Sequence, residues 1–118
     1  MNKGEYFDLN YMVSICDGDW QFMKEMIETF LNDTPGTITA LQEHAHRKEW
    51  KQVAETAHKF KTSLMFMGIQ SLHGTIREIE KSGKEEIETG HVHEKIIRVD
   101  EICKMAMTEL RSFLESHP

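Results

Sequence analysis

Residues 92–113, with the sequence VHEKIIRVDEICKMAMTELRSF, contain the clearest pattern of apolar residues in the chain. Apolar side chains recur there in alternating steps of four and three: Val92, Ile96, Val99, Cys103, Ala106, Leu110 and Phe113. Because an α-helix has about 3.6 residues per turn, this spacing places these side chains along one stripe of a helix surface. A stripe sustained over so many turns is typical of a helix that packs along the seam of a helical bundle.

The rest of the chain has the same helical periodicity, and no segment alternates in the manner of a β-strand. The spacing predicts a short helix at residues 9–16, longer helices at 20–45 and 49–68, and a fourth helix from Ile69 that ends at Ser82-Gly83. Short connections between amphipathic helices favour antiparallel neighbours. The sequence therefore predicts an all-α fold, an antiparallel up-down-up-down four-helix bundle with a short additional N-terminal helix, forming one domain over the whole chain.

Pro35 lies inside the second predicted helix. A proline there removes a backbone donor and clashes with the preceding turn, so the helix either kinks or restarts with Thr34 as its cap. The apolar stripe continues in phase beyond the proline, at Ile38, Leu41 and Ala45. We therefore expect a kinked continuation of one helix.

Composition narrows the possible functions. The chain of 118 residues has 14 Lys and Arg against 20 Asp and Glu, a net charge of −6, which argues against nucleic acid as a partner. No apolar run approaches the roughly 20 residues of a membrane span, so no membrane insertion is expected. Cys16 and Cys103 are too few for a disulfide framework and indicate reduced thiols in a cytoplasmic protein. A bundle seam closed within one chain predicts a monomer.

The seven histidines do not have the spacing of a metal site. His44 and His46 are two residues apart on a helix, so their side chains diverge. The chain has no His-x-x-x-His or Cys-x-x-Cys pair, and no glycine-rich nucleotide loop. We therefore expect neither a metal nor a cofactor bound by this chain alone.

The stretch that indicates function is residues 57–68, AHKFKTSLMFMG. The apolar stripe of its helix comprises Val53, Ala57, Phe60 and Leu64. His58 lies roughly 130° from the centre of that stripe and is expected to point into solvent. Ala54 and Thr62 lie one turn to either side of it, and Lys61 lies beside it. An accessible imidazole next to a cation and little bulk is a candidate nucleophilic site.

The order Ala-His-x-x-Lys-small-Ser around His58 resembles the histidine-containing phosphotransfer (HPt) domain of bacterial two-component phosphorelays. The resemblance extends to further positions on both sides: Trp50, Gly68, Leu72 and the pair Ile79-Glu80. It implies that His58 accepts a phosphoryl group from the aspartate of a receiver domain and passes it to the aspartate of another. The receiver domain, of a response regulator or of a hybrid histidine kinase, would supply both Mg²⁺ and the catalytic aspartate. This chain would then be a phosphate carrier and not an enzyme.

Thr62 departs from the family pattern, in which glycine is more frequent at this position. Its hydroxyl group could bond a phosphoryl oxygen and stabilise the phosphate, or its methyl group could restrict which partner docks. Lys61, one turn from His58, is expected to offset phosphoryl charge.

Gly68 is suited to the left-handed conformation that ends a helix, and a chain reversal there brings Arg77 and Glu80 opposite His58. Glu80 would accept a hydrogen bond from Nδ1 of His58 and leave Nε2 free for attack, while Arg77 would supply charge to a phosphoryl group. The alternative is that Arg77 and Glu80 pair with each other or with solvent.

Several apolar residues fall outside the buried stripes and are candidates for partner docking. Met65 lies almost in line with His58, and Phe66 lies on the other flank of the exposed face of the site helix. Ala54, on the opposite side of His58, is a third candidate. The resemblance implies that Met12 and Ile15 of the N-terminal helix complete an apolar ring around the histidine. The alternative is that these residues pack beneath the short helix. A second function therefore stays open at this point, a non-catalytic helical adaptor that binds a signalling partner.

Overall fold

A computed structural model of the chain describes residues 2–118 and contains five α-helices within them. The helices are α1 Asn10–Ile15, α2 Trp20–His46, α3 Trp50–Phe66, α4 His73–Glu85 and α5 Val92–Ser116. Short 3₁₀ turns at Gln70–Leu72 and Thr89–His91 precede α4 and α5. No named strand occurs in this part of the chain, so the all-α prediction is confirmed.

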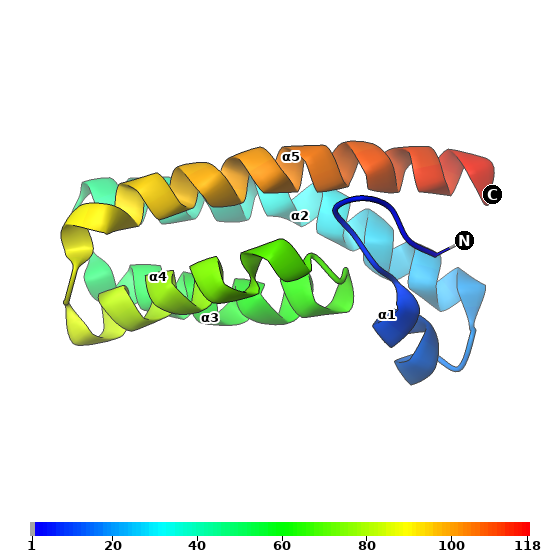
Figure 1. Cartoon of the computed structure of the whole chain (residues 1–118), viewed down its shortest axis with the longest axis horizontal. Helices are drawn as coiled ribbons and strands as arrows, with labels where there is room; N and C mark the ends of the chain where they lie inside the picture. The colour runs from blue at the N-terminus through cyan, green and yellow to red at the C-terminus, as the bar shows by residue number, and fades with distance from the viewer. Residues whose placement is uncertain (1) are drawn as a thin grey trace.

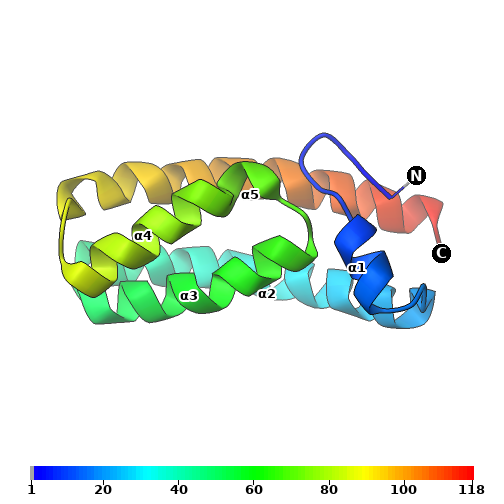
Figure 2. The same ribbon diagram turned by 60° about the horizontal axis from the view of Figure 1, so that its bottom comes forward.

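The four longer helices form an antiparallel bundle of 42 × 23 × 20 Å (Figure 1). α2 packs against α3 and α5, and α4 packs against the same two helices. The long helices α2 and α5 run side by side along the bundle, while α3 and α4 form a shorter hairpin against them (Figure 2). α1 lies at the end of this hairpin, beside both termini.

The predicted stripe of α5 lies in the core, where all seven of its residues are at most 8% exposed. It meets buried residues from the other helices, among them Ile27, Leu41, Leu64 and Ile79. Burial also raises the pKa of the Cys103 thiol to about 12. Neither Cys103 nor Cys16 forms a disulfide. No helix in residues 2–118 has the length and apolar character needed to cross a bilayer.

α2 is a single helix of 27 residues that continues through Pro35. The structure therefore does not contain a second helix that restarts at Thr34. The N-terminus of α2 is capped by Asp19, whose side chain accepts a hydrogen bond of 3.2 Å from the backbone N–H of Phe22.

The predicted end of the fourth helix was wrong. α4 continues through Ser82 and Gly83, both buried, and ends at Glu85 with Glu86 in the left-handed conformation. A Cβ atom on residue 83 would lie 2.7 Å from the carbonyl oxygen of Trp50 and 2.9 Å from the backbone nitrogen of Ala54. Gly83 is thus the point where α4 approaches the backbone of α3, and it does not terminate its helix.

Gly68 does reverse the chain, as its sequence context predicts. It lies two residues after the end of α3 and has φ +63°, a conformation that residues with a side chain rarely adopt. A Cβ atom there would also collide with the backbone of Asp8. Gly68 therefore serves both the turn from α3 to α4 and the contact with the N-terminal segment.

Candidate functional site

His58 lies near the middle of α3 on the face that looks away from the core. Its side chain is 67% exposed, and its Nδ1 atom lies 2.7 Å from Oε2 of Glu80 on α4. The two residues are 22 positions apart, so the contact depends on the reversal at Gly68 that sets α3 against α4. The imidazole is thus held on one side and open to solvent on the other.

The Glu80 carboxylate bridges the two basic side chains of the site. Its other oxygen, Oε1, accepts a hydrogen bond of 2.7 Å from Nζ of Lys61, and its side chain is only 20% exposed. The hydrogen bond from Lys61 holds the pKa of the Glu80 carboxyl below its usual value. Partial burial acts in the opposite direction, and the hydrogen bond with His58 lowers the pKa further. Glu80 is therefore ionised at neutral pH.

This ionisation determines which nitrogen of His58 is free. An ionised carboxylate only accepts hydrogen bonds, so the Nδ1 atom facing Glu80 carries the hydrogen. In the neutral imidazole the lone pair then lies on Nε2. The site consequently presents an oriented nitrogen nucleophile in solvent.

The Hpt domain sequence model matches residues 25–114, which is most of the chain. The chain belongs to the Hpt domain family. Hpt domains are carrier modules for histidine phosphotransfer in two-component phosphorelays, and they interact with receiver domains of response regulators or hybrid kinases. No curated protein and no solved structure matches the chain.

The matched region of this Hpt domain includes α3 and α4, and therefore His58, Lys61 and Glu80, while α1 lies outside it. A groove of about 580 Å³ lies beside His58 and Glu80, between α3 and α4. Its lining includes Ala54 and Gly83, which carry little or no side chain. Small residues thus keep one flank of the imidazole open.

Thr62 is exposed one turn beyond His58, and no hydrogen bond from its hydroxyl group is found within residues 2–118. By contrast, the Thr37 hydroxyl donates to the backbone of Asp33, one turn earlier in its own helix. The Thr62 hydroxyl is therefore available to another group.

The expected contact of Arg77 with the site is absent from the part of the chain that the structure describes. Arg77 is exposed and forms no hydrogen bond or ion pair there with His58 or Glu80. The buried stripe of α4 runs through Ile76, Ile79 and Gly83. Arg77 lies roughly 130° from the centre of that stripe, and Glu80 only about half as far. Glu80 therefore reaches α3, whereas Arg77 points into solvent.

The residues expected to dock a partner separate into two groups. Ile15 and Met65 are 47% and 40% exposed, so both are available to a partner. Met12, in contrast, is fully buried, and its assignment to the docking surface was wrong. The reason is that α1 turns Met12 into the bundle core and leaves the opposite face to solvent.

Two exposed aromatic residues near this surface were not anticipated from the sequence. Tyr11 of α1 stacks on the half-buried ring of Phe66, with centroids 6.0 Å apart and planes 12° from parallel. Phe22, at the start of α2, is 50% exposed. Their placement beside the end of α3 depends on the position of α1, which periodicity alone does not give.

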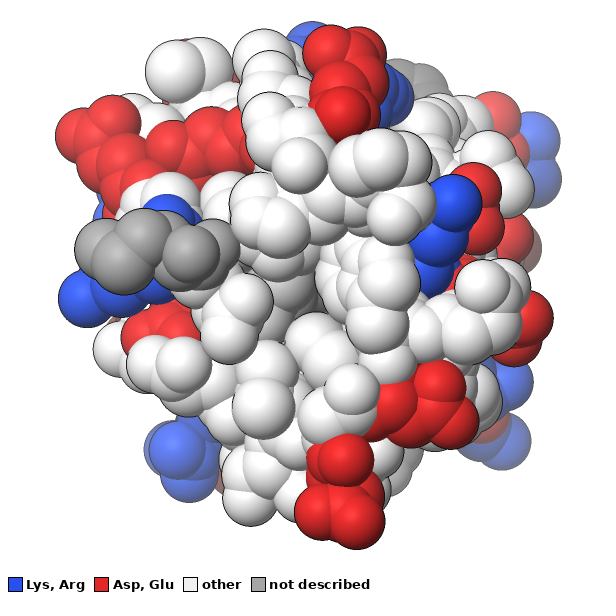
Figure 3. Space-filling model, turned by 90° about the vertical axis from the view of Figure 1, so that its right-hand side faces the viewer, with Lys and Arg blue, Asp and Glu red and all other residues white. Residues whose placement is uncertain are grey.

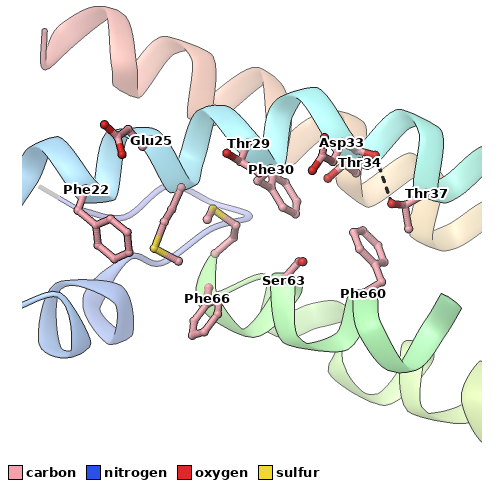
Figure 4. A pocket seen from close by; sticks show the side chains of 12 residues that line it. Phe22, Glu25, Thr29, Phe30, Asp33, Thr34, Thr37, Phe60, Ser63 and Phe66 are labelled. Atoms are coloured by element: carbon pink, nitrogen blue, oxygen red, sulfur yellow. Dashed lines mark hydrogen bonds between the residues drawn. The ribbon is translucent and has the colours of Figure 1, made fainter. Parts of the chain in front are cut away.

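A second hollow, of about 310 Å³, lies between α2 and the end of α3 (Figure 4). The parallel rings of Phe30 and Phe60 face each other in it, with centroids 6.3 Å apart. Phe66 and Phe22 lie toward its α1 end. This hollow extends the exposed apolar region around α1 along the α2–α3 interface.

No cluster of three or more possible metal-binding side chains occurs within residues 2–118. His91 lies 3.8 Å from Glu94, and His44 lies 2.8 Å from Glu49, so these surface histidines have carboxylates as neighbours.

Proposed function

We propose that this Hpt domain is a phosphorelay intermediate that receives a phosphoryl group on Nε2 of His58 from an aspartyl phosphate of one receiver domain. It then passes the group to the aspartate of another receiver domain. The observation that carries this proposal is the hydrogen bond of 2.7 Å between Nδ1 of the exposed His58 and Oε2 of the partly buried Glu80. That geometry suits a histidine that must react with the surface of a second protein.

The transfer step balances without a further reactant. The lone pair of Nε2 attacks phosphorus, the bond from phosphorus to the aspartyl oxygen breaks, and the aspartate leaves as a carboxylate with the bonding electrons. The imidazole then bears phosphate on Nε2 and hydrogen on Nδ1, and Glu80 stabilises the positive charge that develops on the ring. The reverse sequence delivers the group to the next aspartate.

The receiver domain would supply what this chain lacks for the reaction. Mg²⁺ bound by the receiver's carboxylates would neutralise charge on the phosphoryl oxygens. Lys61 would keep Glu80 ionised and in place, which is supported by the 2.7 Å hydrogen bond between them. It would also contribute positive charge beside the phosphoryl group. The free hydroxyl group of Thr62 would donate to a phosphoryl oxygen.

Docking would use the exposed surface on the same side of the bundle. Ala54 would let the receiver approach His58 closely, and Met65, Phe66 and Ile15 would contact an apolar part of the receiver. We further propose that the domain acts as a monomer in the cytoplasm. The unpaired thiols of Cys16 and Cys103 agree with a reducing compartment.

The test is phosphotransfer from an Mg²⁺-loaded, phosphorylated receiver domain to the wild type and to His58→Gln. The expected result is acid-labile, base-stable phosphate on the wild type and none on His58→Gln. His46→Gln is the matched control, since His46 is also exposed on a helix but lies outside the site. Binding of receivers without any transfer would contradict the proposal and favour a non-catalytic adaptor.

A further inference from the structure

The segment before α1 is attached to α5 in two ways: the Phe7 ring packs edge-on against Phe113, and the side chain of Glu109 accepts two backbone hydrogen bonds. Its Oε2 atom accepts a hydrogen bond of 2.8 Å from the backbone N–H of Glu5, and its Oε1 atom accepts one of 2.7 Å from the backbone N–H of Tyr6. More than 100 residues separate the partners in sequence. Figure 1 shows the segment doubling back beside α5 before it reaches α1.

The same segment forms a closed loop that packs tightly against the Glu109 carboxylate. The N–H of Leu9 donates to the carbonyl oxygen of Asn2 at 2.8 Å, so residues 2–9 form a closed loop. A Cβ atom on Gly4 would lie 2.7 Å from Oε1 of Glu109 and 2.6 Å from the ring of Phe7. The absence of a side chain at residue 4 therefore allows the carboxylate to reach its two donors.

The other side of the loop is attached to the end of α3. The N–H of Asp8 donates to the carbonyl oxygen of Met67 at 3.1 Å, directly before the turn at Gly68. The loop thus connects α5 to the helix that carries His58.

α1 depends on this loop for its position. A helix of six residues is too short to be stable alone, so its placement must come from its attachments. Met12 anchors one face in the core, and Tyr11 and Ile15 are about half exposed on the other face. Met65 is an exposed apolar residue close to the end of α3. It lies seven residues beyond His58, or about 10 Å along the helix.

The end of the bundle that carries α1 has an uncharged centre. Figure 3 shows this end, where side chains other than Lys, Arg, Asp and Glu occupy the middle and charged ones lie around the edge. An uncharged centre within a charged rim is the usual composition of a protein–protein interface. The surface lies beyond His58 at the C-terminal end of α3, where Tyr11 stacks on Phe66, and Phe66 also lines the hollow between α2 and α3.

We propose that Glu109 is a positioning residue for receiver docking: by holding the loop of residues 2–9, it fixes α1 so that Tyr11 and Ile15 contact the apolar surface of a receiver bound at His58. This inference rests on the proposed function. It assigns part of receiver recognition to residues that lie outside the matched region of the family, 25–114. Glu109 itself does not touch the reacting atoms.

The test compares Glu109→Gln with the wild type in steady-state transfer from a phosphorylated receiver domain. Glutamine keeps one acceptor oxygen and replaces the other with an amide group that cannot accept from Tyr6 or Glu5. We expect KM for the phosphorylated receiver to rise at least about threefold, because a charge-assisted pair of hydrogen bonds is lost. We expect kcat to stay within about twofold, because the reacting atoms are unchanged.

Two further variants separate positioning from loss of fold. Glu101→Gln removes an exposed carboxylate of α5 that has no hydrogen bond or ion pair within residues 2–118, and it should behave as wild type. Gly4→Ala places a Cβ atom against the Glu109 carboxylate, displaces it from its two backbone donors, and should raise KM in the same way. Phosphorylation of His58 by phosphoramidate, which needs no docking surface, should proceed at the wild-type rate in all three variants.

An unchanged KM in Glu109→Gln, or an equal loss of transfer and of phosphoramidate reactivity, would overturn the inference. Amide hydrogen exchange tests the anchoring directly. The N–H groups of Val13 and Cys16, which bond to Leu9 and Met12 at 2.9 Å, should exchange faster in Glu109→Gln. Unchanged exchange would also overturn the inference. Absence of transfer to the wild type would instead contradict the proposed function, and the exchange result would still decide whether Glu109 anchors α1.

Discussion

At the scale of single residues, the site depends on one carboxylate that serves two basic groups. Glu80 accepts hydrogen bonds from His58 and Lys61, each at 2.7 Å. Lys61 is therefore not a free cation in the unphosphorylated domain. Its first effect is to keep Glu80 ionised, and through Glu80 it sets the tautomer of His58. The imidazole of His58 is thus oriented by Glu80 and, through Glu80, by Lys61.

Replacement of Glu80 should slow phosphorylation of His58 without abolishing it. Glu80→Gln retains a hydrogen-bonding group but loses the negative charge that stabilises the developing positive charge on the ring. We expect the transfer rate from a receiver to fall by about 100-fold, the lower end of the effects seen when one charge-stabilising group is removed. Rapid-quench measurement of the first turnover would show this. A wild-type rate in a folded Glu80→Gln variant would contradict the role of the carboxylate.

The lowered pKa of Glu80 also predicts a pH dependence of stability. A carboxyl group whose pKa is lower in the folded state adds stability that is fully present above its unfolded pKa of about 4.5 and is lost as the pH falls through the folded value. Urea unfolding of the wild type and Glu80→Gln should therefore differ most at neutral pH, and the difference should shrink as the pH falls below the unfolded pKa and through the lower folded pKa. A constant difference across this range would contradict the ion-pair arrangement.

At the scale of secondary-structure elements, the contact between α3 and α4 determines the site. Gly83 lets the two backbones approach beside Ala54, within one turn of His58 along α3 and of Glu80 along α4. Any side chain at residue 83 would separate the helices there and lengthen the distance between His58 and Glu80. The packing of this pair is consequently part of the site.

Gly83→Ala should destabilise the domain by about 1–3 kcal/mol, because its Cβ atom meets backbone atoms of Trp50 and Ala54 that cannot move without shifting α3. Gly74→Ala in the same helix is the matched control. A Cβ atom at residue 74 has no neighbour within 4 Å, so alanine there should gain about 0.5 kcal/mol. Urea unfolding measures both. Equal effects of the two substitutions would show that the helices do not approach closely at Gly83.

The elements also show where inference from sequence succeeds and where it fails. The stripe of α5 was predictable because helical periodicity is a local property and its side chains needed only a core to face. The end of α4 was not predictable, because a glycine can either end a helix or let two helices pack closely. Only the position of α3 shows that Gly83 serves close packing. Met12 was misassigned for a similar reason, since the segment before α1 is attached to residues far along the chain, among them Met67 and Glu109.

At the scale of the whole molecule, one chain closes its own core. Each of the four longer helices packs against two others, and the buried apolar residues form one cluster that includes α1 and the segment before it. The bundle is also elongated, with the site on the flank of the α3–α4 hairpin and the α1 surface at one end. A receiver that covers both would contact two regions with different chemistry.

The closed core predicts a monomer in solution. Light scattering should give a mass of 13.8 kDa at micromolar concentrations. A stable dimer at these concentrations would contradict this prediction.

The central claim is that phosphate is carried on Nε2 of His58 while Nδ1 stays bonded to Glu80. The most direct measurement is NMR of the histidine side-chain nitrogens before and after transfer from a phosphorylated receiver. We predict that phosphorus couples to Nε2 of His58 and that the Nδ1 hydrogen is retained, with the other histidines unchanged. Phosphate on Nδ1, on another residue, or on no residue of the folded domain would contradict the account.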